Sequence, residues 1–161
     1  MMNKKMNLVI RNALICCLYA ALTVGIAPLS YGGIQMRFAE ILIFLAFFNK
    51  RYVPGLILGC LIANLFSPMG LPDVIFGTSA TAIVCILLAR IKNIYLVALI
   101  GGLVNGIVVG AELYVVLQLP FIISALEVFI GEFLVLLIGT LIFKVISKND
   151  TFMKKYINNN A

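Results

Sequence analysis

Five acidic side chains of this sequence stand inside or beside strongly apolar stretches: Glu40, Asp73, Glu112, Glu127 and Glu132. A charged group deep in a lipid bilayer costs about 2.5–3.5 kcal/mol on insertion scales, so acids in a membrane-spanning segment mark binding sites or proton paths. Carboxylates attract cations and accept hydrogen bonds from N–H donors. The sequence therefore predicts a polar site that takes a cation, protons, or a ligand rich in N–H groups.

Polar side chains of other types accompany these acids. Asn105 precedes Glu112 by two helical turns, which places both on the same face of a helix. Aromatic side chains near the same positions could stack on a flat ligand. We expect the site to draw on the following residues: Glu112, Glu127, Asn105, Arg37, Glu40, Gln35, Asn64, Asp73 and Tyr114.

Each of these residues also has a purely structural explanation. Arg37 and Glu40 are spaced so that they can pair with each other on one helix. Asp73 can cap a helix, and Glu132 can be a protonated or paired packing group. The asparagines can form hydrogen bonds between helices, and an aromatic residue near a membrane interface is commonly an anchor.

The composition indicates that the chain lies in a membrane. Of its 161 residues, 63% are hydrophobic and 11% are charged, and the mean hydropathy is +1.16. Soluble domains carry about 25% charged residues, so an all-α integral membrane protein is expected, without room for a soluble catalytic or ATP-binding domain. The sequence contains no histidine, the commonest general base and metal ligand. Neither an enzyme nor a metal site is expected.

Apolar stretches separated by turn-forming and charged segments predict a single domain of six membrane-spanning helices over residues 1–147. The second and third stretches are short for a hydrocarbon core of about 30 Å. We expect helices at about residues 11–30, 35–48, 53–66, 73–89, 94–117 and 121–143. Residues 148–161 are expected to form a polar cytoplasmic tail that frays.

The basic residues predict an orientation. An excess of Lys and Arg on cytoplasmic segments is typical of multi-pass membrane proteins. With both termini in the cytoplasm, the cytoplasmic segments hold 11 of the 12 basic residues, and Arg37 alone lies on the other side. The net charge of +6 therefore calls for no nucleic-acid partner. The eleven are Lys4, Lys5, Arg11, Lys50, Arg51, Arg90, Lys92, Lys144, Lys148, Lys154 and Lys155.

Four stretches of the sequence resemble the QueT (queuosine-precursor transporter) family, and the similarity extends over about residues 10–147. The resemblance implies the substrate-binding S component of an energy-coupling-factor (ECF) transporter in the bacterial cell membrane. Such a component is a six-helix bundle that associates with a transmembrane T component and two ATPase subunits. The stretches are Ala27-Pro-Leu-Ser-Tyr-Gly-Gly-Ile-Gln-Met-Arg-Phe-Ala-Glu40, Pro54-Gly-Leu-Ile-Leu-Gly-Cys-Leu-Ile-Ala-Asn64, Asp73-Val-Ile-Phe-Gly77 and Asn105-Gly-Ile-Val-Val-Gly-Ala-Glu112.

The resemblance also implies a partner interface on the first helix. In the family this helix carries an alanine-rich stripe that contacts the T component. The matching residues are Ala13, Cys17, Ala20 and Ala21, with Cys17 where alanine would be usual. Close packing inside the bundle is the alternative explanation for such a stripe.

The implied substrates are 7-deazaguanines, and the predicted site suits them. A guanine-like edge presents adjacent N–H donors that one carboxylate can accept together, and an aminomethyl group would supply a cation for a second. We expect Glu112 and Glu127 in these two roles. No cofactor is expected, because ATP would be bound only by the partner ATPases. Which 7-deazaguanine binds stays open. Two alternatives also stay open: an autonomous proton- or cation-coupled transporter, and an S component for another vitamin.

Overall fold

The computed structural model of the protein describes residues 4–31 and 35–157. Within these ranges the chain is helical and contains no strand, which confirms the all-α expectation. The elements are α1 (Lys4–Gly25), α2 (Ala27–Ser30), the 3-10 helix η1 (Phe38–Ile43), α3 (Phe44–Phe48), the 3-10 helix η2 (Lys50–Tyr52), α4 (Val53–Asn64), α5 (Leu71–Leu88), α6 (Tyr95–Leu117), α7 (Phe121–Ile146), α8 (Asp150–Phe152) and the π-helical turn η3 (Met153–Ile157).

Four helices of the described chain are long and apolar enough to cross a membrane: residues Lys5–Gly25, Leu71–Leu88, Tyr95–Leu117 and Phe121–Ile146. The chain is therefore a multi-pass membrane protein. Two shorter apolar segments, Phe38–Phe48 and the 12-residue α4, account for the other two expected helices. At 1.5 Å per residue, α4 extends about 18 Å, so a count of six crossings stays a prediction.

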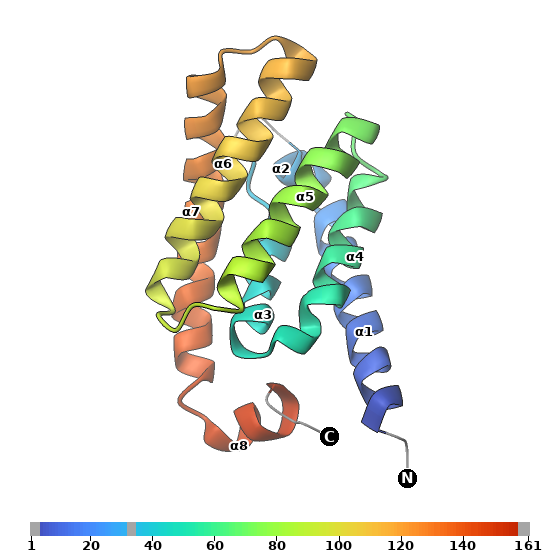
Figure 1. Ribbon diagram of the computed structural model, residues 1–161, viewed down its shortest axis with the longest axis vertical. Helices are drawn as coiled ribbons and strands as arrows, with labels where there is room; N and C mark the ends of the chain where they lie inside the picture. The colour runs from blue at the N-terminus through green and yellow to red at the C-terminus, as the bar shows by residue number, and fades with distance from the viewer. Residues whose placement is uncertain (1–3, 32–34, 158–161) are drawn as a thin grey trace.

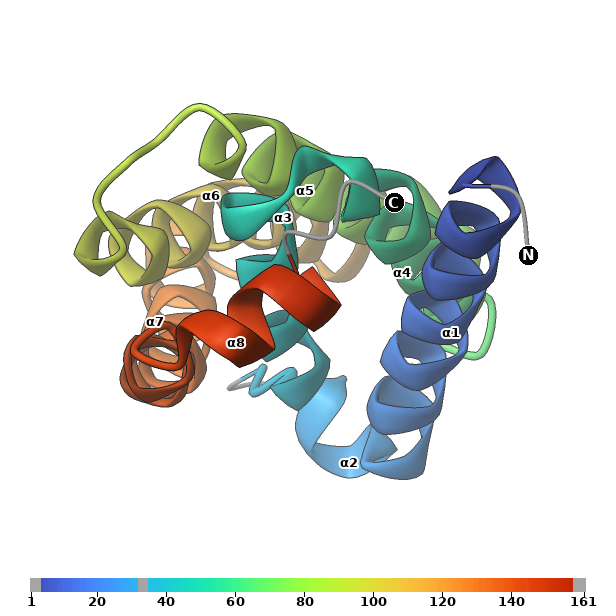
Figure 2. The ribbon, with the colours of Figure 1, turned by 90° about the horizontal axis from the view of Figure 1, so that it is seen from below.

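The helices form a bundle in which neighbours in sequence are mostly neighbours in space (Figure 1). α6 and α7 make an antiparallel hairpin, α5 packs between α6 and α4, and α1 packs along α4. The segment η1–α3 lies among the long helices and contacts α1, α5 and α7. Seen from below, α1 and α7 stand on opposite sides of α3 (Figure 2).

The tight contact between α6 and α7 depends on two glycines. A Cβ atom at Gly110 would lie 2.8 Å from the Cα atom of Ala125, and one at Gly106 would lie 2.8 Å from its carbonyl oxygen. A larger side chain at either position would push the helices apart. Small residues of this kind let membrane helices approach closely, and here they fix the position of both walls of the site described below.

Several helix ends differ from the sequence-based expectation. α1 begins at Lys4 rather than residue 11, and residues 27–30 form the separate turn α2. The second helix begins at Phe38 rather than Gln35, because Arg37 has an extended backbone with φ −82° and ψ 92°. This segment is a 3-10 helix up to Ile43. The other expected helices agree with the structure to within three residues at each end.

The C-terminal segment differs most from the expectation. Residues Asp150–Ile157 form the turns α8 and η3, so the prediction of a frayed tail is wrong for this part. Met153 and Ile157 are buried and join the main apolar core. The side-chain amide of Asn49 donates a 2.9 Å hydrogen bond to the carbonyl oxygen of Ile157. Apolar side chains four residues apart therefore fold this segment back under the bundle.

One end of the bundle carries nearly all the basic segments. The start of α1, the turn between α3 and α4, the loop between α5 and α6, and the C-terminal segment all lie at this end (Figure 1). The eleven basic residues named above belong to these segments. We call it the basic end; its location in the cytoplasm stays a prediction.

Candidate functional site

Seven of the nine predicted site residues are buried in the described structure, each with at most 3% of its surface exposed. They come from α4, α5, α6, η1 and the segment that precedes η1. Glu132, which the sequence presents equally as a packing group, is also buried. The seven are Gln35, Arg37, Glu40, Asn64, Asp73, Asn105 and Glu112.

An ion pair between Arg37 and Asp73 lies at the centre of these residues. The Nη2 atom of Arg37 is 3.6 Å from the Oδ1 atom of Asp73, and each side chain is only 1% exposed. Asp73 belongs to the first turn of α5 but makes no capping hydrogen bond, and the Ser67 hydroxyl donates to it. The ion pair of Arg37 in the described chain is therefore with Asp73 on another helix, rather than with Glu40.

Further contacts hold the Arg37 guanidinium in place. Its Nε donates a 3.4 Å hydrogen bond to the carbonyl oxygen of Ser30, and its Cζ lies 5.8 Å from the centre of the Tyr31 ring. Burial raises the pKa of the Tyr31 phenol, which donates a 2.6 Å hydrogen bond to the carbonyl oxygen of Ala63. The aromatic ring beside the candidate site is thus Tyr31.

Glu40 is held by donors from two other helices. The Tyr19 phenol of α1 and the Thr81 hydroxyl of α5, at 2.9 Å, both donate to its Oε1 atom. The Thr81 hydroxyl also lies 3.2 Å from the Cys60 sulfur, and the Asn64 amide donates to the same sulfur at 3.4 Å. This network ties α1, η1, α4 and α5 together around one carboxylate.

Glu112 and Glu132 complete the group from the other side of the bundle. Glu112 is 0% exposed and Glu132 is 1% exposed. Glu112 lies within electrostatic range of the like-charged Asp73, and Glu132 lies within range of the like-charged Glu40 and the oppositely charged Arg37. We call these five residues, Arg37, Glu40, Asp73, Glu112 and Glu132, the acidic cluster.

The cluster leaves buried polar atoms without hydrogen-bond partners in the described structure. More than nine in ten buried polar groups of folded proteins are paired, so orphans gathered in one place point to a missing partner. Both carboxylate oxygens of Glu112 are orphaned, and so is one oxygen each of Glu40 and Glu132. The atoms without a hydrogen bond are Ser30 Oγ, Arg37 Nη2, Glu40 Oε2, Asn64 Oδ1, Asp73 Oδ1, Glu112 Oε1, Glu112 Oε2 and Glu132 Oε2. Of these, Arg37 Nη2 and Asp73 Oδ1 face each other in the ion pair.

The backbone of α5 passes directly beside the cluster at Gly77. A Cβ atom there would lie 2.9 Å from the Asn64 Nδ2 atom and 3.2 Å from the Arg37 Nη1 atom. Glycine at this position therefore makes room for both side chains. The arrangement can accept several N–H donors or a cation through its carboxylates and through Oδ1 of Asn64, and it presents Arg37 as a donor.

Two of the predicted residues lie elsewhere. Glu127 is exposed on α7, and Tyr114 on α6 is 53% exposed. Asn105 is buried, but its amide bonds within its own helix, to the carbonyl oxygen of Gly101 at 3.1 Å. The structure thus does not bring Glu127 or Tyr114 to the acidic cluster.

Helical register distinguishes Glu132 from Glu127, and the sequence contains this signal. The buried residues of α7 recur three or four apart, and the series includes Val128, Gly131, Glu132 and Val135. Glu132 follows Val128 by one turn and lies on the buried face, whereas Glu127 is out of register. Depth in the membrane alone, without the helical register, favours Glu127 over Glu132 as a site residue.

The small-residue stripe of α1 faces outward. Ala13, Cys17 and Ala21 are exposed, and Ala20 is half-buried. The neighbouring Leu14 is 65% exposed. Internal packing therefore does not explain this stripe in the described chain.

Comparisons with known proteins agree with this architecture. The sequence profile of the family described as QueT transporter matches residues 9–148. Over 152 residues the chain is 32% identical to the queuosine precursor transporter QueT of Lactococcus lactis subsp. cremoris (strain MG1363), a match that covers 84% of this chain and 89% of that protein. No solved structure matches the chain. The chain therefore belongs to the QueT transporter family, and it is a membrane transporter protein rather than an enzyme.

Proposed function

We propose that this protein is the substrate-binding S component of an ECF importer that takes up a queuosine precursor of the 7-deazaguanine class across the bacterial cell membrane. Membership of the QueT family and the name of the Lactococcus relative support the substrate class. The observation that carries the proposal is the set of orphaned polar atoms in the acidic cluster.

The chemistry of a 7-deazaguanine complements these atoms. Its guanine-like edge carries adjacent N–H donors, which a carboxylate with both oxygens unoccupied can accept together. Glu112 offers such a carboxylate. The carbonyl oxygen of the ligand would accept from Arg37, the unpartnered Oδ1 atom of Asn64 would accept from a further N–H group, and the flat ring would lie against Tyr31.

The charge balance of the cluster favours a ligand with an amine. Arg37 pairs with Asp73, and Oε1 of Glu40 accepts from two hydroxyls. One carboxylate oxygen of Glu132 has no hydrogen-bond donor. Glu132 would therefore be the second carboxylate, the one that binds an amine, in place of Glu127. An aminomethyl substituent would place a cation beside Glu132, so we expect the aminomethyl base to bind more tightly than the cyano base.

The energy for uptake would come from partner proteins. The sequence contains no GxxxxGK[ST] phosphate-binding loop, so ATP would be bound by the two ATPase subunits and not by this chain. The exposed stripe of Ala13, Cys17 and Ala21 supports α1 as the surface that meets the T component.

The test is ligand binding to the purified full chain in lipid nanodiscs. Unfolding temperature and binding heat are measured with the aminomethyl base, the cyano base and queuine, with riboflavin and thiamine as controls. A ligand at 100 times its Kd adds about 2.7 kcal/mol to the free energy of unfolding. We expect a shift with the aminomethyl base and none with the controls. A shift with a control vitamin alone would overturn the substrate class.

A second candidate function draws on the same acids. Carboxyl groups buried inside a membrane form proton relays in transporters, so a proton-coupled or cation-coupled carrier is the alternative. Uptake of the base by proteoliposomes that contain this chain alone, driven by an ion gradient, would support the alternative. Uptake that requires the T component and ATP would support the ECF proposal.

A further inference from the structure

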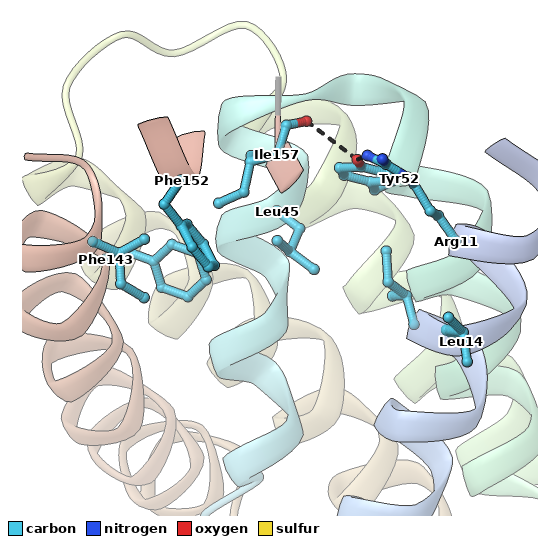
Figure 3. Close-up of a pocket in the computed structure, with 9 residues that line it drawn as sticks. Arg11, Leu14, Leu45, Tyr52, Phe143, Phe152 and Ile157 are labelled. Carbon is cyan, nitrogen blue, oxygen red and sulfur yellow. Dashed lines mark hydrogen bonds between the residues drawn. The ribbon is translucent and has the colours of Figure 1, made fainter. Parts of the chain in front are cut away.

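A cavity lies at the basic end of the bundle, and none of the residues that line it belongs to the acidic cluster. Its volume is about 470 Å³, within the range of about 300–1,000 Å³ that is usual for small-molecule sites. Figure 3 shows the residues that form it. They are Arg11, Leu14, Ile15, Leu45, Tyr52, Phe143, Ile146, Phe152 and Ile157.

The walls of this cavity are apolar and come from both sides of the bundle. α1 supplies Leu14, α7 supplies Phe143, and Leu45 of α3 forms the floor between them (Figure 3). Phe143 is fixed by stacking on Phe44, with ring centres 5.1 Å apart. The walls are therefore held by the packed core rather than by mobile surface side chains.

The C-terminal segment covers the water-facing side of the cavity. Phe152 and Ile157 extend over Leu45 (Figure 3). The Tyr52 phenol donates to the carbonyl oxygen of Ile157 at 3.2 Å. The folded segment thus separates the apolar cavity from the water at this end.

Two helices that are long and apolar enough to cross a membrane form the edges of the cavity. It is lined by both α1 and α7, which are candidate membrane spans. Leu14 at its edge is 65% exposed, and Val145 on the neighbouring turn of α7 is 68% exposed. The occupant that reaches an apolar opening of this kind most directly is a hydrocarbon chain.

Positive charge borders the same opening. Arg11 lines the cavity and donates from Nη1 to the Tyr52 phenol at 3.1 Å. Lys148, Lys154 and Lys155 are exposed on the adjoining C-terminal segment, where Asp150 is the only acid among the described residues. Basic residues beside the ends of membrane helices attract anionic lipid head groups.

We propose that this cavity binds one acyl chain of an anionic phospholipid, with the lipid phosphate held at Arg11 and the basic C-terminal segment. Apolar walls between two candidate membrane spans and a positive rim match the two parts of such a lipid. The proposal is independent of the transported solute, because the cavity shares no residue with the acidic cluster.

The test uses the purified full chain in detergent and native mass spectrometry. Phosphatidylglycerol and phosphatidylcholine with identical acyl chains are added in turn, and glycerol phosphate is added as the free head group. We expect one phosphatidylglycerol to be retained per chain, with weaker retention of phosphatidylcholine and none of glycerol phosphate. Equal retention of the two lipids, or binding of glycerol phosphate, would overturn the proposal.

Matched variants locate the site. Ile146→Trp fills the cavity, whereas Ile138→Trp makes the same change on an exposed, distant turn of α7. Arg11→Gln removes the charge at the rim, and Lys92→Gln removes an exposed charge from the loop between α5 and α6. We expect Ile146→Trp to abolish specific retention and Arg11→Gln to weaken it about fivefold, while the two controls retain lipid normally. Normal retention by Ile146→Trp would overturn the proposal.

A second measurement covers the case in which a cavity variant fails to fold. Phosphatidylglycerol with a photoreactive acyl chain is cross-linked to the unmodified protein, and the labelled peptides are identified. Labels on Leu14, Leu45 or Phe143 would support the site. Labels spread evenly over the exposed faces of α6 and α7 would overturn it.

Discussion

The phenol of Tyr19, on the helix with the outward-facing stripe, donates a hydrogen bond to the carboxylate of Glu40 in the acidic cluster. Tyr19 lies on the buried face of α1, opposite the exposed stripe, because it stands two residues from both Cys17 and Ala21 and a helix turns once every 3.6 residues. A ligand that changes the position of Glu40 would thereby act on α1. This contact gives the candidate site a direct physical connection to the surface proposed for the T component.

Tyr19→Phe should uncouple the acidic cluster from the exposed stripe of α1. It removes one of the two donors to the Oε1 atom of Glu40, and a hydrogen bond to a charged group contributes about 1.5–3 kcal/mol, so we expect a lower free energy of unfolding. We also expect ligand-dependent association with the T component to weaken more than ligand affinity itself. Both are measured on the purified chain, with the exposed Tyr114→Phe as the control. Equal losses of affinity and association would contradict a coupling role.

The Arg37–Asp73 pair should show strong coupling in a double-mutant cycle. Removing one partner of a buried ion pair costs about 3–5 kcal/mol because the other charge stays buried alone. Arg37→Gln and Asp73→Asn should each lower the unfolding temperature strongly. The decrease in the double variant should be much smaller than the sum of the two single decreases. Calorimetry in detergent measures all four proteins, and additive losses would exclude the pair as a stabilising contact.

Glu112 and Glu127 form a natural test pair for ligand binding. Glu112 is 0% exposed with both oxygens orphaned, whereas Glu127 is exposed. Hydrogen bonds to charged groups contribute about 1.5–3 kcal/mol, so Glu112→Gln should weaken binding about tenfold or more. Glu127→Gln should leave the Kd unchanged. Titration calorimetry distinguishes them, and the reverse order would restore Glu127 as the ligand contact.

Gly77→Ala should impair binding more than folding. The added Cβ would lie 2.9 Å from Asn64 Nδ2 and 3.2 Å from Arg37 Nη1, so both side-chain ends must shift within the candidate site. Alanine is otherwise favoured over glycine in a helix by about 1 kcal/mol. Gly25→Ala is the control, because a Cβ there meets nothing within 4 Å. Unchanged ligand affinity in Gly77→Ala would place the ligand away from Arg37 and Asn64.

The sequence predicts the all-helical fold class and the burial of most of the candidate site residues, for clear physical reasons. Long apolar stretches must become helices in lipid, because only helices satisfy their own backbone groups within one segment. Charges that cannot face lipid must turn inward, and so Arg37, Glu40, Asp73 and Glu112 meet as expected. The pairing of Arg37 with Asp73 required the three-dimensional arrangement, because 36 residues separate them in sequence.

Other features depended on contacts that no local pattern contains. The extended backbone at Arg37 delays the second helix to Phe38, and this conformation accompanies burial of the guanidinium against Asp73. The order of the C-terminal segment comes from burial of Met153 and Ile157 in a core made by distant helices. Composition alone makes the same segment look like a polar tail.

The place of the acidic cluster along the bundle would make the proposed binding of a cationic ligand sensitive to the membrane voltage. Glu132 lies near the middle of the 26-residue α7, so a cationic ligand that reaches it crosses part of the electric field of the membrane. A full crossing is worth about 2.3 kcal/mol per charge at 100 mV. A polarised cell would thus fill this site with an amine-bearing base more completely than a depolarised one, before any ATP is consumed.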